Sequence, residues 1–260
     1  MQEARLGNPD RMKPPITIAL LLACTGCGKT PDEQTHPPIA PQDGTAEDAL
    51  RKLIRQGSAF TSISFTKLIK VASGRNVIPF NAARSPETSI LNGLAGALDK
   101  TLAELNQDSS PVRQLRRINE ASRFFENAIA AHMDKLPGFS CEFPKSASGK
   151  VQRSGYPDLK ITHLASGRIC YLDPKLFESS SRGSTLRTFY YQPRTRTGKI
   201  HYDAHHLVVG IEHDGNDGAW RFTGWELVDL AGLKLSLKSE FQGSNRDIYR
   251  DELILRRSKR

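Results

Sequence analysis

One segment, residues 156–175, constrains the fold of this 260-residue chain more than any other, because it has the pattern of two strands joined by a tight turn. In antiparallel pairing about that turn, His163 lies opposite Arg168. Continuing the same register outward places Asp158 opposite Asp173. The segment therefore predicts a β-hairpin with two carboxylates brought together at its open end.

The two faces of this hairpin differ in polarity, since side chains alternate between the faces of a strand. One face carries Asp158, Lys160, Thr162, Ile169, Tyr171, Asp173 and Lys175, and the apolar face carries Leu159, Ile161, Cys170, Leu172 and Leu176. Opposed residues have Cβ atoms about 4.5–5.5 Å apart, and like charges in such positions destabilise a sheet. The simplest use of the paired carboxylates is to hold a divalent cation. The alternative is an ordinary hairpin with charged strand ends.

The motifs Pro157-Asp158 and Asp173-Pro174-Lys175 resemble those of the PD-(D/E)XK nuclease superfamily, the fold of many restriction endonucleases. In that family Pro-Asp opens one strand and (Asp/Glu)-x-Lys lies on the next. The resemblance covers residues 112–230 and rests on short motifs, since Pro-Asp occurs three times in the chain and Asp-x-Lys twice. It implies an α/β fold, with a restriction endonuclease-like core of mixed β-sheet flanked by helices and an N-terminal helical region.

The resemblance also implies a set of catalytic residues, namely Asp158, Asp173, Lys175 and Glu126. Asp158, Asp173 and Glu126 are the expected ligands of Mg²⁺, with Mn²⁺ as an alternative, together with the backbone carbonyl of Pro174. Proline keeps this carbonyl although it lacks an N–H. Because the missing N–H cannot pair in a sheet, the strand is expected to be at an edge or bulged at that point. A bound divalent cation lowers the pKa of water and polarises a phosphoryl oxygen. Lys175 would orient water or contact the phosphate, or else simply pair with Asp173 at the surface.

Glu126 enters this set through the pattern of residues 112–136, which predicts a helix. Apolar residues recur there at intervals of three and four positions, as on one face of an amphipathic helix. Glu126 lies at the margin of this apolar stripe, whereas Glu120 shares a face with arginines. Glu126 is therefore the better candidate, and a plain surface glutamate remains the alternative.

The chain is basic, with a formal net charge of +9, which suggests a polyanionic partner without identifying it. Residues 179–202 contain no acidic residue and interleave cations with aromatic rings. This segment predicts phosphate contacts to bound DNA, although a solvated basic loop would show the same pattern. The expected DNA-binding residues are Arg182, Arg187, Arg194, Arg196 and Lys199. Contacts between two copies of the chain in a homodimer are a further expectation.

The amino terminus resembles a bacterial lipoprotein signal, because Met12-Lys13 precedes an apolar run at residues 16–23 and then two cysteines. Cys24 or Cys27 would be the lipidated residue, which predicts a membrane anchor in the bacterial envelope facing the periplasm. A fortuitous apolar start on a cytoplasmic enzyme is the alternative. The sequence Gly28-Lys29-Thr30 imitates a phosphate-binding loop but runs into Pro31 instead of a helix, so no nucleotide cofactor is expected.

Four regions are expected along the chain: a signal peptide at residues 1–23, a flexible tether at 24–44, a helical region at 45–110 and the nuclease core at 111–260. Helices are predicted at residues 45–56 and 85–105. Adjacent His205 and His206 point to opposite faces of a predicted strand, and no neighbouring residue completes a usual zinc site. These histidines are expected to serve structure or to contact the DNA backbone.

Together these features predict a divalent-metal-dependent DNA endonuclease tethered to the envelope. One rival is a cytoplasmic Type II site-specific restriction endonuclease. The other is a non-catalytic envelope lipoprotein that binds DNA or protein.

Overall fold

The computed structural model describes residues 47–48, 51, 61–185, 189–193, 198–238, 244–248, 250–254 and 256. The chain divides into two units, Met1–Glu47 and Asp48–Arg260, and the second contains the fold. The predicted signal peptide, the tether, Cys24 and Cys27 lie outside the described residues, as does most of the helix predicted at 45–56. No helix in the described part of the chain is long and apolar enough to cross a membrane.

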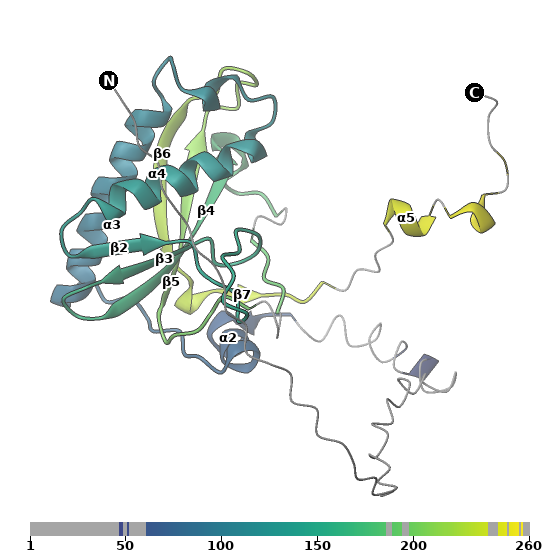
Figure 1. The fold of residues 1–260 in the computed structure, drawn as a ribbon, viewed down its shortest axis with the longest axis horizontal. Helices are drawn as coiled ribbons and strands as arrows, with labels where there is room; N and C mark the ends of the chain where they lie inside the picture. The colour runs from purple at the N-terminus through teal and green to yellow at the C-terminus, as the bar shows by residue number, and fades with distance from the viewer. Residues whose placement is uncertain are drawn as a thin grey trace, which may run out of the picture. The chain divides into compact units, whose positions relative to one another are not determined.

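A five-stranded mixed sheet forms the centre of the second unit, with the strand order β2-β3-β4-β5-β6 (Figure 1). All neighbouring strands pair antiparallel except β4 and β5, which pair parallel. The predicted α/β class with a mixed sheet flanked by helices is confirmed. The strands are β2 (Phe139–Glu142), β3 (Leu159–His163), β4 (Arg168–Glu178), β5 (His205–His213) and β6 (Phe222–Asp229), and a separate pair joins β1 (Ile63–Ser64) to β7 (Lys234–Leu235).

The hairpin of β3 and β4 has the predicted register. His163 pairs with Arg168, and the ladder continues to Leu159 opposite Leu172. Asp158 and Asp173 are the next residues outward, so they lie where the two strands stop pairing. Beyond this point β4 continues to pair with β5 through Glu178. Pro174 therefore lies on a part of β4 that β3 does not pair, as its missing N–H requires.

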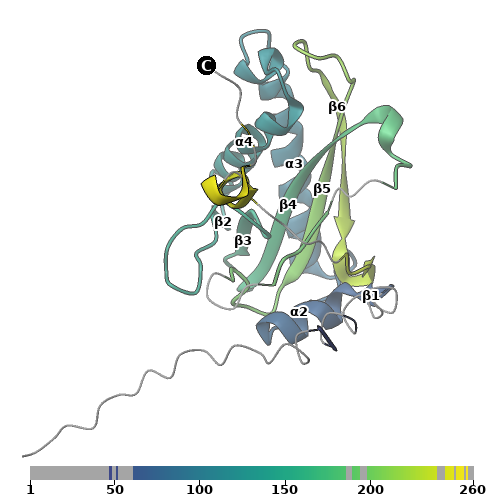
Figure 2. The ribbon, with the colours of Figure 1, turned by 90° about the vertical axis from the view of Figure 1, so that its right-hand side faces the viewer.

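Helices cover one face of the sheet, where α3 (Ser85–Leu105) and α4 (Ser122–Asp134) pack against the apolar side of the hairpin (Figure 2). The predicted helix at 85–105 is confirmed, with Pro86 in its first turn. The helices and strands share one hydrophobic core, so residues on both sides of position 110 pack together. The central members of this core are Ile90, Leu94, Leu98, Phe125, Ile129, Leu159, Ile161, Leu172 and Val209.

A second hydrophobic cluster covers the opposite face of the sheet, which the hairpin pattern alone presents as polar. The short helix α2 (Phe65–Ser73) buries Phe65 and Ile69 against Tyr171 of β4 and Ala204. Helix α2 has no counterpart among the predicted elements. Its signals were the spacing of Phe65 and Ile69 and the glycine that follows, Gly74, whose φ of 72° ends the helix in the left-handed conformation.

The prediction of one helix over residues 112–136 is wrong in its first half. The structure has two 3₁₀ turns there, η1 (Pro111–Gln114) and η2 (Ile118–Ala121), and α4 begins only at Ser122. Leu115 is extended, with φ −65° and ψ 134°. Its carbonyl accepts a hydrogen bond of 2.7 Å from the indole Nε1–H of Trp220. A partner distant in sequence thus takes a carbonyl that a continuous helix would need.

Candidate active site

Asp158 and Asp173 meet where β3 and β4 separate, and the structure brings both to one point as predicted. Pro157 and Pro174 are buried beside them, and Asp173 is only 3 % exposed. Lys175 lies two residues after Asp173 and therefore on the same face of β4. Its Nζ is 2.5 Å from Asp173 Oδ2.

The Lys175–Asp173 ion pair leaves a carboxylate oxygen incompletely satisfied. Although Lys175 Nζ is close, Asp173 Oδ2 is buried and has no partner with the angles of a hydrogen bond. Lys175 also approaches the Pro174 carbonyl at 3.5 Å. The carbonyl predicted as a ligand therefore lies within reach of the same ammonium as the carboxylate. A buried acceptor without a hydrogen bond is uncommon and needs an explanation.

The arrangement disfavours ionisation of Asp158. The pKa of its carboxyl is raised to about 8. Burial is the largest cause, followed by the negative charge of Asp173 and a side-chain hydrogen bond with Asp173. Lys175 acts in the opposite direction, and Glu126 adds a smaller upward effect. Two carboxylates that share a site cannot both ionise freely unless a positive charge compensates them.

Glu126 is buried on α4 and acts electrostatically on Asp158, but another residue engages it directly. Arg153 donates from Nη2 to Glu126 Oε2 at 2.9 Å and to Asn127 Oδ1 at 2.8 Å. The Arg153 guanidinium also lies over the ring of Phe143, 4.0 Å from its centroid. Glu126 therefore joins α4 to the loop before Asp158. Sequence reasoning missed Arg153, because an arginine in an irregular loop carries no pattern that indicates its partner.

The predicted DNA-binding residues have different environments. Arg182 is exposed and holds both carboxylate oxygens of Glu226, at 2.7 and 2.8 Å, beside a pocket of about 760 Å³ that Lys175 also lines. Arg187, Arg194 and Arg196 lie outside the described residues.

Lys199 requires a correction. It is only 3 % exposed, and its ammonium donates to backbone carbonyls, so its burial argues against a direct phosphate contact.

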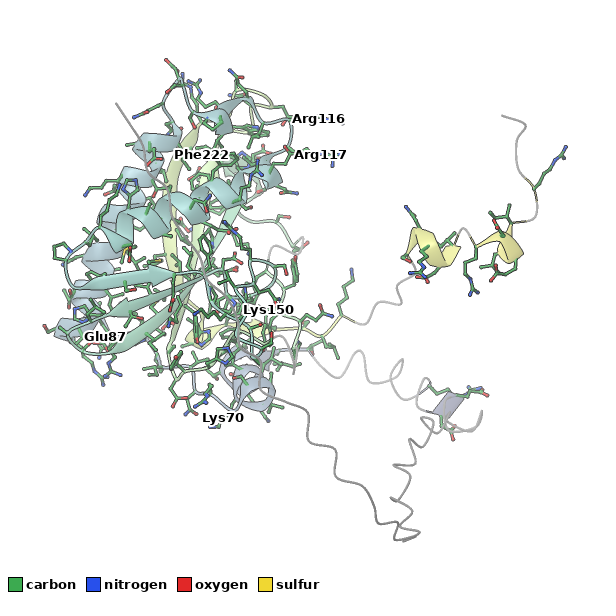
Figure 3. All side chains as sticks on the ribbon, viewed as in Figure 1. Lys70, Glu87, Arg116, Arg117, Lys150 and Phe222 are labelled. Carbon is green, nitrogen blue, oxygen red and sulfur yellow. The ribbon has the colours of Figure 1, made fainter. Side chains whose placement is uncertain are left out.

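Two further exposed cations lie near one end of the helical layer, and a third lies apart from them. Arg116 and Arg117 project into solvent close to the start of α4, and Lys150 lies in the loop that precedes Asp158 (Figure 3). Exposed cations therefore also occur outside residues 179–202, the segment predicted to contact DNA.

The histidines are structural, as one of the two expectations had it. His205 and His206 are fully buried. His206 Nδ1 forms a hydrogen bond of 2.7 Å with Tyr156 Oη, and His205 Nδ1 forms one of 2.9 Å with the carbonyl of Ile78. Burial lowers the pKa of His206 to about 3, which keeps its ring neutral. Across the described ranges, no group of three or more His, Cys, Asp and Glu side chains is close enough to hold a metal ion.

Comparison with known proteins gives this site its context. The sequence profile of the Type II restriction enzyme MjaV family matches residues 59–252. The chain belongs to this family. It is also 31 % identical over 221 residues to the Type II restriction enzyme MjaV of Methanocaldococcus jannaschii, a similarity that covers 80 % of this chain and 93 % of the relative.

Membership in the MjaV family identifies the protein as a DNA endonuclease. The matched residues contain the hairpin, α4 and the basic segment, so every predicted catalytic residue lies within the family region. The first 58 residues precede it, and the comparisons give no support to a lipoprotein signal there.

Proposed function

We propose that this MjaV-family endonuclease hydrolyses DNA phosphodiester bonds at the open end of the β3–β4 hairpin, in a reaction that depends on Mg²⁺ or Mn²⁺. The single observation that carries the proposal is the convergence of three side chains. Asp158 and Asp173 lie next to the last paired residues of the hairpin, and Lys175 forms an ion pair with Asp173.

The donor set suits a hard divalent cation. Asp173 Oδ2 is a buried acceptor without a hydrogen bond, and ionisation of Asp158 is disfavoured by burial and by its acidic neighbour. Lys175 supplies one positive charge beside Asp173, and a cation between the two carboxylates would supply the compensation that Asp158 lacks. Asp158, Asp173 and the carbonyl of Pro174 would hold the ion. Glu126 does not complete a group of three ligating carboxylates in the described residues, and it would act on the site through its charge. When bound, such an ion lowers the pKa of water and neutralises charge on the phosphoryl group.

The protein's own groups have separate roles in this proposal. Lys175 keeps its ammonium beside Asp173 and can donate a hydrogen bond to a phosphate oxygen or to the attacking water. Asp158 and Asp173 hold their position because β3 and β4 fix both backbones by pairing directly behind them. Arg153 holds Glu126 and the loop before Asp158 together, which limits how far these carboxylates can separate.

Of the two settings expected from the sequence, we propose the cytoplasmic, site-specific one. Support comes from the similarity to a Type II restriction enzyme over nearly the whole length of that relative. An enzyme in that setting must spare the host chromosome, so its recognition sequence would be methylated by a companion enzyme. The homodimer stays a prediction.

The proposal is tested by cleavage of plasmid DNA with the full-length protein. We expect discrete fragments in Mg²⁺, no cleavage in EDTA, and a loss of at least about 100-fold in rate for Asp173→Asn, in line with the loss of a charge that stabilises a transition state. DNA binding in Ca²⁺ should persist in this variant, which shows that it folds.

The matched control is Glu142→Gln. Glu142 pairs with Lys160 at 2.5 Å on the neighbouring strands and takes no part in the proposed site. Equal cleavage by wild type and Asp173→Asn, or cleavage that persists in EDTA, would show that this hairpin is not the active site.

A further inference from the structure

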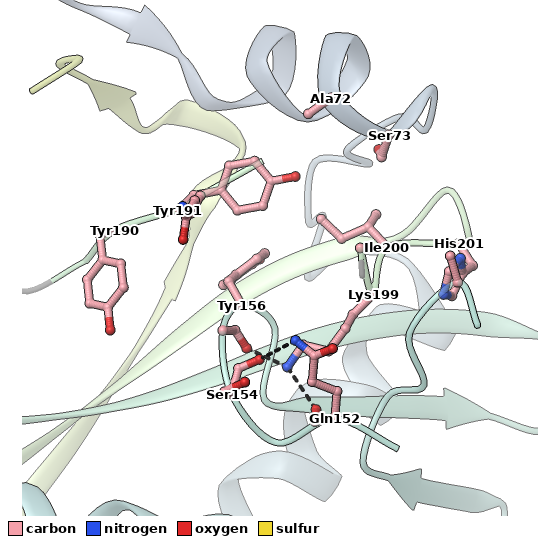
Figure 4. A pocket seen from close by; sticks show the side chains of 14 residues that line it. Ala72, Ser73, Gln152, Ser154, Tyr156, Tyr190, Tyr191, Lys199, Ile200 and His201 are labelled. Carbon is pink, nitrogen blue, oxygen red and sulfur yellow. Dashed lines mark hydrogen bonds between the residues drawn. The ribbon is translucent and has the colours of Figure 1, made fainter. Parts of the chain in front are cut away.

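Lys199 differs from Arg182, the other described cation of the basic segment, in having its charge buried. Its Nζ donates to the carbonyl of Gln152 at 3.2 Å and to the carbonyl of Gly155 (Figure 4). An ammonium removed from water is costly unless it is paired and hydrogen-bonded. Both of its partners belong to one short loop, residues 152–155, and Asp158 follows that loop by three residues.

The backbone around Lys199 is fixed from the other side. Ile200 packs in the second hydrophobic cluster, and the N–H of His201 donates to Tyr171 Oη at 3.0 Å. Tyr171 precedes Asp173 by two residues on β4. A little further on, the N–H of Ala204 donates to the carbonyl of Asn76 at 3.1 Å. Lys199 thus connects a segment fastened to the strand of Asp173 with the loop that leads to Asp158.

The carboxylates of the site act on this ammonium. Burial lowers the pKa of Lys199, and the charges of Asp158, Asp173 and Glu126 oppose that effect in decreasing order. The same loop is held a second time, because its residue Arg153 donates to Glu126. Two cations therefore hold the loop. Arg153 attaches it to Glu126 of α4, and Lys199 binds its backbone carbonyls.

We propose that Lys199 is a positioning residue for DNA cleavage, which fixes the 152–155 loop and so holds Asp158 opposite Asp173. This inference rests on the proposed function, because it assigns Lys199 to the same reaction. Lys199 would contact the loop and not the DNA, which reverses the role expected from its place in the basic segment. A loss of position in an active site costs rate more than affinity.

The test compares full-length Lys199→Met and Lys199→Arg with wild type. We expect Lys199→Met to lower kcat by at least about tenfold, with KM for plasmid DNA and Kd in Ca²⁺ within about twofold. Amide hydrogen exchange in residues 150–158 should accelerate in the metal-free protein, because the loop loses its tie. Lys199→Arg keeps a charge and several donors and should recover part of both losses.

Lys160→Met is the control, since it also removes a lysine, one that is half-buried and lies on β3. Lys160 pairs with Glu142 and lies 5.0 Å from the ring centroid of Tyr202, outside the loop. It should leave kcat and the exchange of residues 150–158 unchanged.

Several outcomes would overturn the inference. Weaker DNA binding at unchanged kcat would assign Lys199 to phosphate contact, and unchanged kcat and exchange would remove its positioning role. If Lys199→Met does not fold, Lys199→Arg decides: faster loop exchange with reduced kcat and unchanged Kd supports the inference, and reduced affinity alone refutes it. Failure of the proposed function gives a different result, namely that wild type and Asp173→Asn cut DNA equally or not at all.

Discussion

Asp158 and Asp173 are held together by strand pairing, although their charges repel each other. The hairpin imposes the approach, since the two residues directly extend a ladder that ends at Leu159 and Leu172. Asp158 responds with a pKa raised to about 8 from 3.8, mainly because it is buried. Without a cation, the protein should therefore favour protonated Asp158 over much of the neutral range.

This pKa predicts how stability depends on pH in EDTA. Because the folded protein binds the Asp158 proton more tightly than the unfolded chain, the stabilisation is complete below about pH 4 and is lost as the pH rises towards about 8. Asp158→Asn imitates the protonated form at every pH. We expect the variant to melt a few degrees above wild type at high pH and to match it in acid, as measured by thermal unfolding.

Magnesium provides the second arm of that experiment. At high pH a fixed excess of Mg²⁺ should raise the Tm of wild type and have less effect on Asp158→Asn. A ligand stabilises the folded state by RT ln(1 + [L]/Kd), and the loss of a carboxylate ligand raises Kd. A Tm difference that stays constant between acid and alkaline pH would contradict the raised pKa.

At the scale of elements, distant partners decide where α4 begins. Residues 112–121 have helical periodicity, yet they form two 3₁₀ turns because Trp220 binds the carbonyl of Leu115. Trp220 is 3 % exposed, and its ring meets that of His213 edge to face with centroids 5.2 Å apart. The loop before β6 thus shapes the approach to the helix that carries Glu126.

Trp220→Phe tests this role. The change keeps an aromatic ring but leaves the Leu115 carbonyl without its donor, which should lower the free energy of unfolding by about 1–3 kcal/mol. Hydrogen exchange should accelerate in residues 112–121. Trp225→Phe is the control, since its Nε1–H donates to an exposed partner, Asp99, and its loss should cost less. Equal destabilisation by the two changes would argue against the assigned role.

The elements that local patterns could predict were the strands of the hairpin, its register and α3. Alternation and turn position determine a register by themselves, so the meeting of Asp158 and Asp173 was predictable. Three features were not. The break at Leu115 depends on Trp220, the burial of Lys199 depends on carbonyls some 45 residues earlier in the chain, and Arg153 finds Glu126 only in the folded state. Such contacts have no signature in a single sequence.

For the molecule as a whole, the formal charge of +9 favours association with DNA, but individual cations are already engaged. Arg182 illustrates this competition. Its side chain is 67 % exposed, and Glu226 holds it in a two-oxygen ion pair. A phosphate would have to displace that carboxylate before it could bind the guanidinium.

The competition predicts opposite effects of two changes on DNA affinity in Ca²⁺. Glu226→Gln should strengthen binding by freeing Arg182, whereas Arg182→Gln should weaken it and reduce the slope of log K against log salt by about 1. The measurement is a salt titration of binding for both single variants and the double variant. If Glu226→Gln strengthens binding equally without Arg182, the ion pair is not what restrains the arginine.

The position of Pro174 also bears on how the protein avoids aggregation through a strand edge. Beyond Leu172, β4 has no β3 partner, and its residues from Lys175 to Glu178 line the larger pocket. A stretch of strand edge without a paired strand can accept a strand from a second polypeptide and so start an aggregate. A proline at the second position of that edge removes a donor such docking would use, and flanking charges discourage it further. The residue whose carbonyl we propose as a metal ligand would thus also disfavour edge-to-edge association.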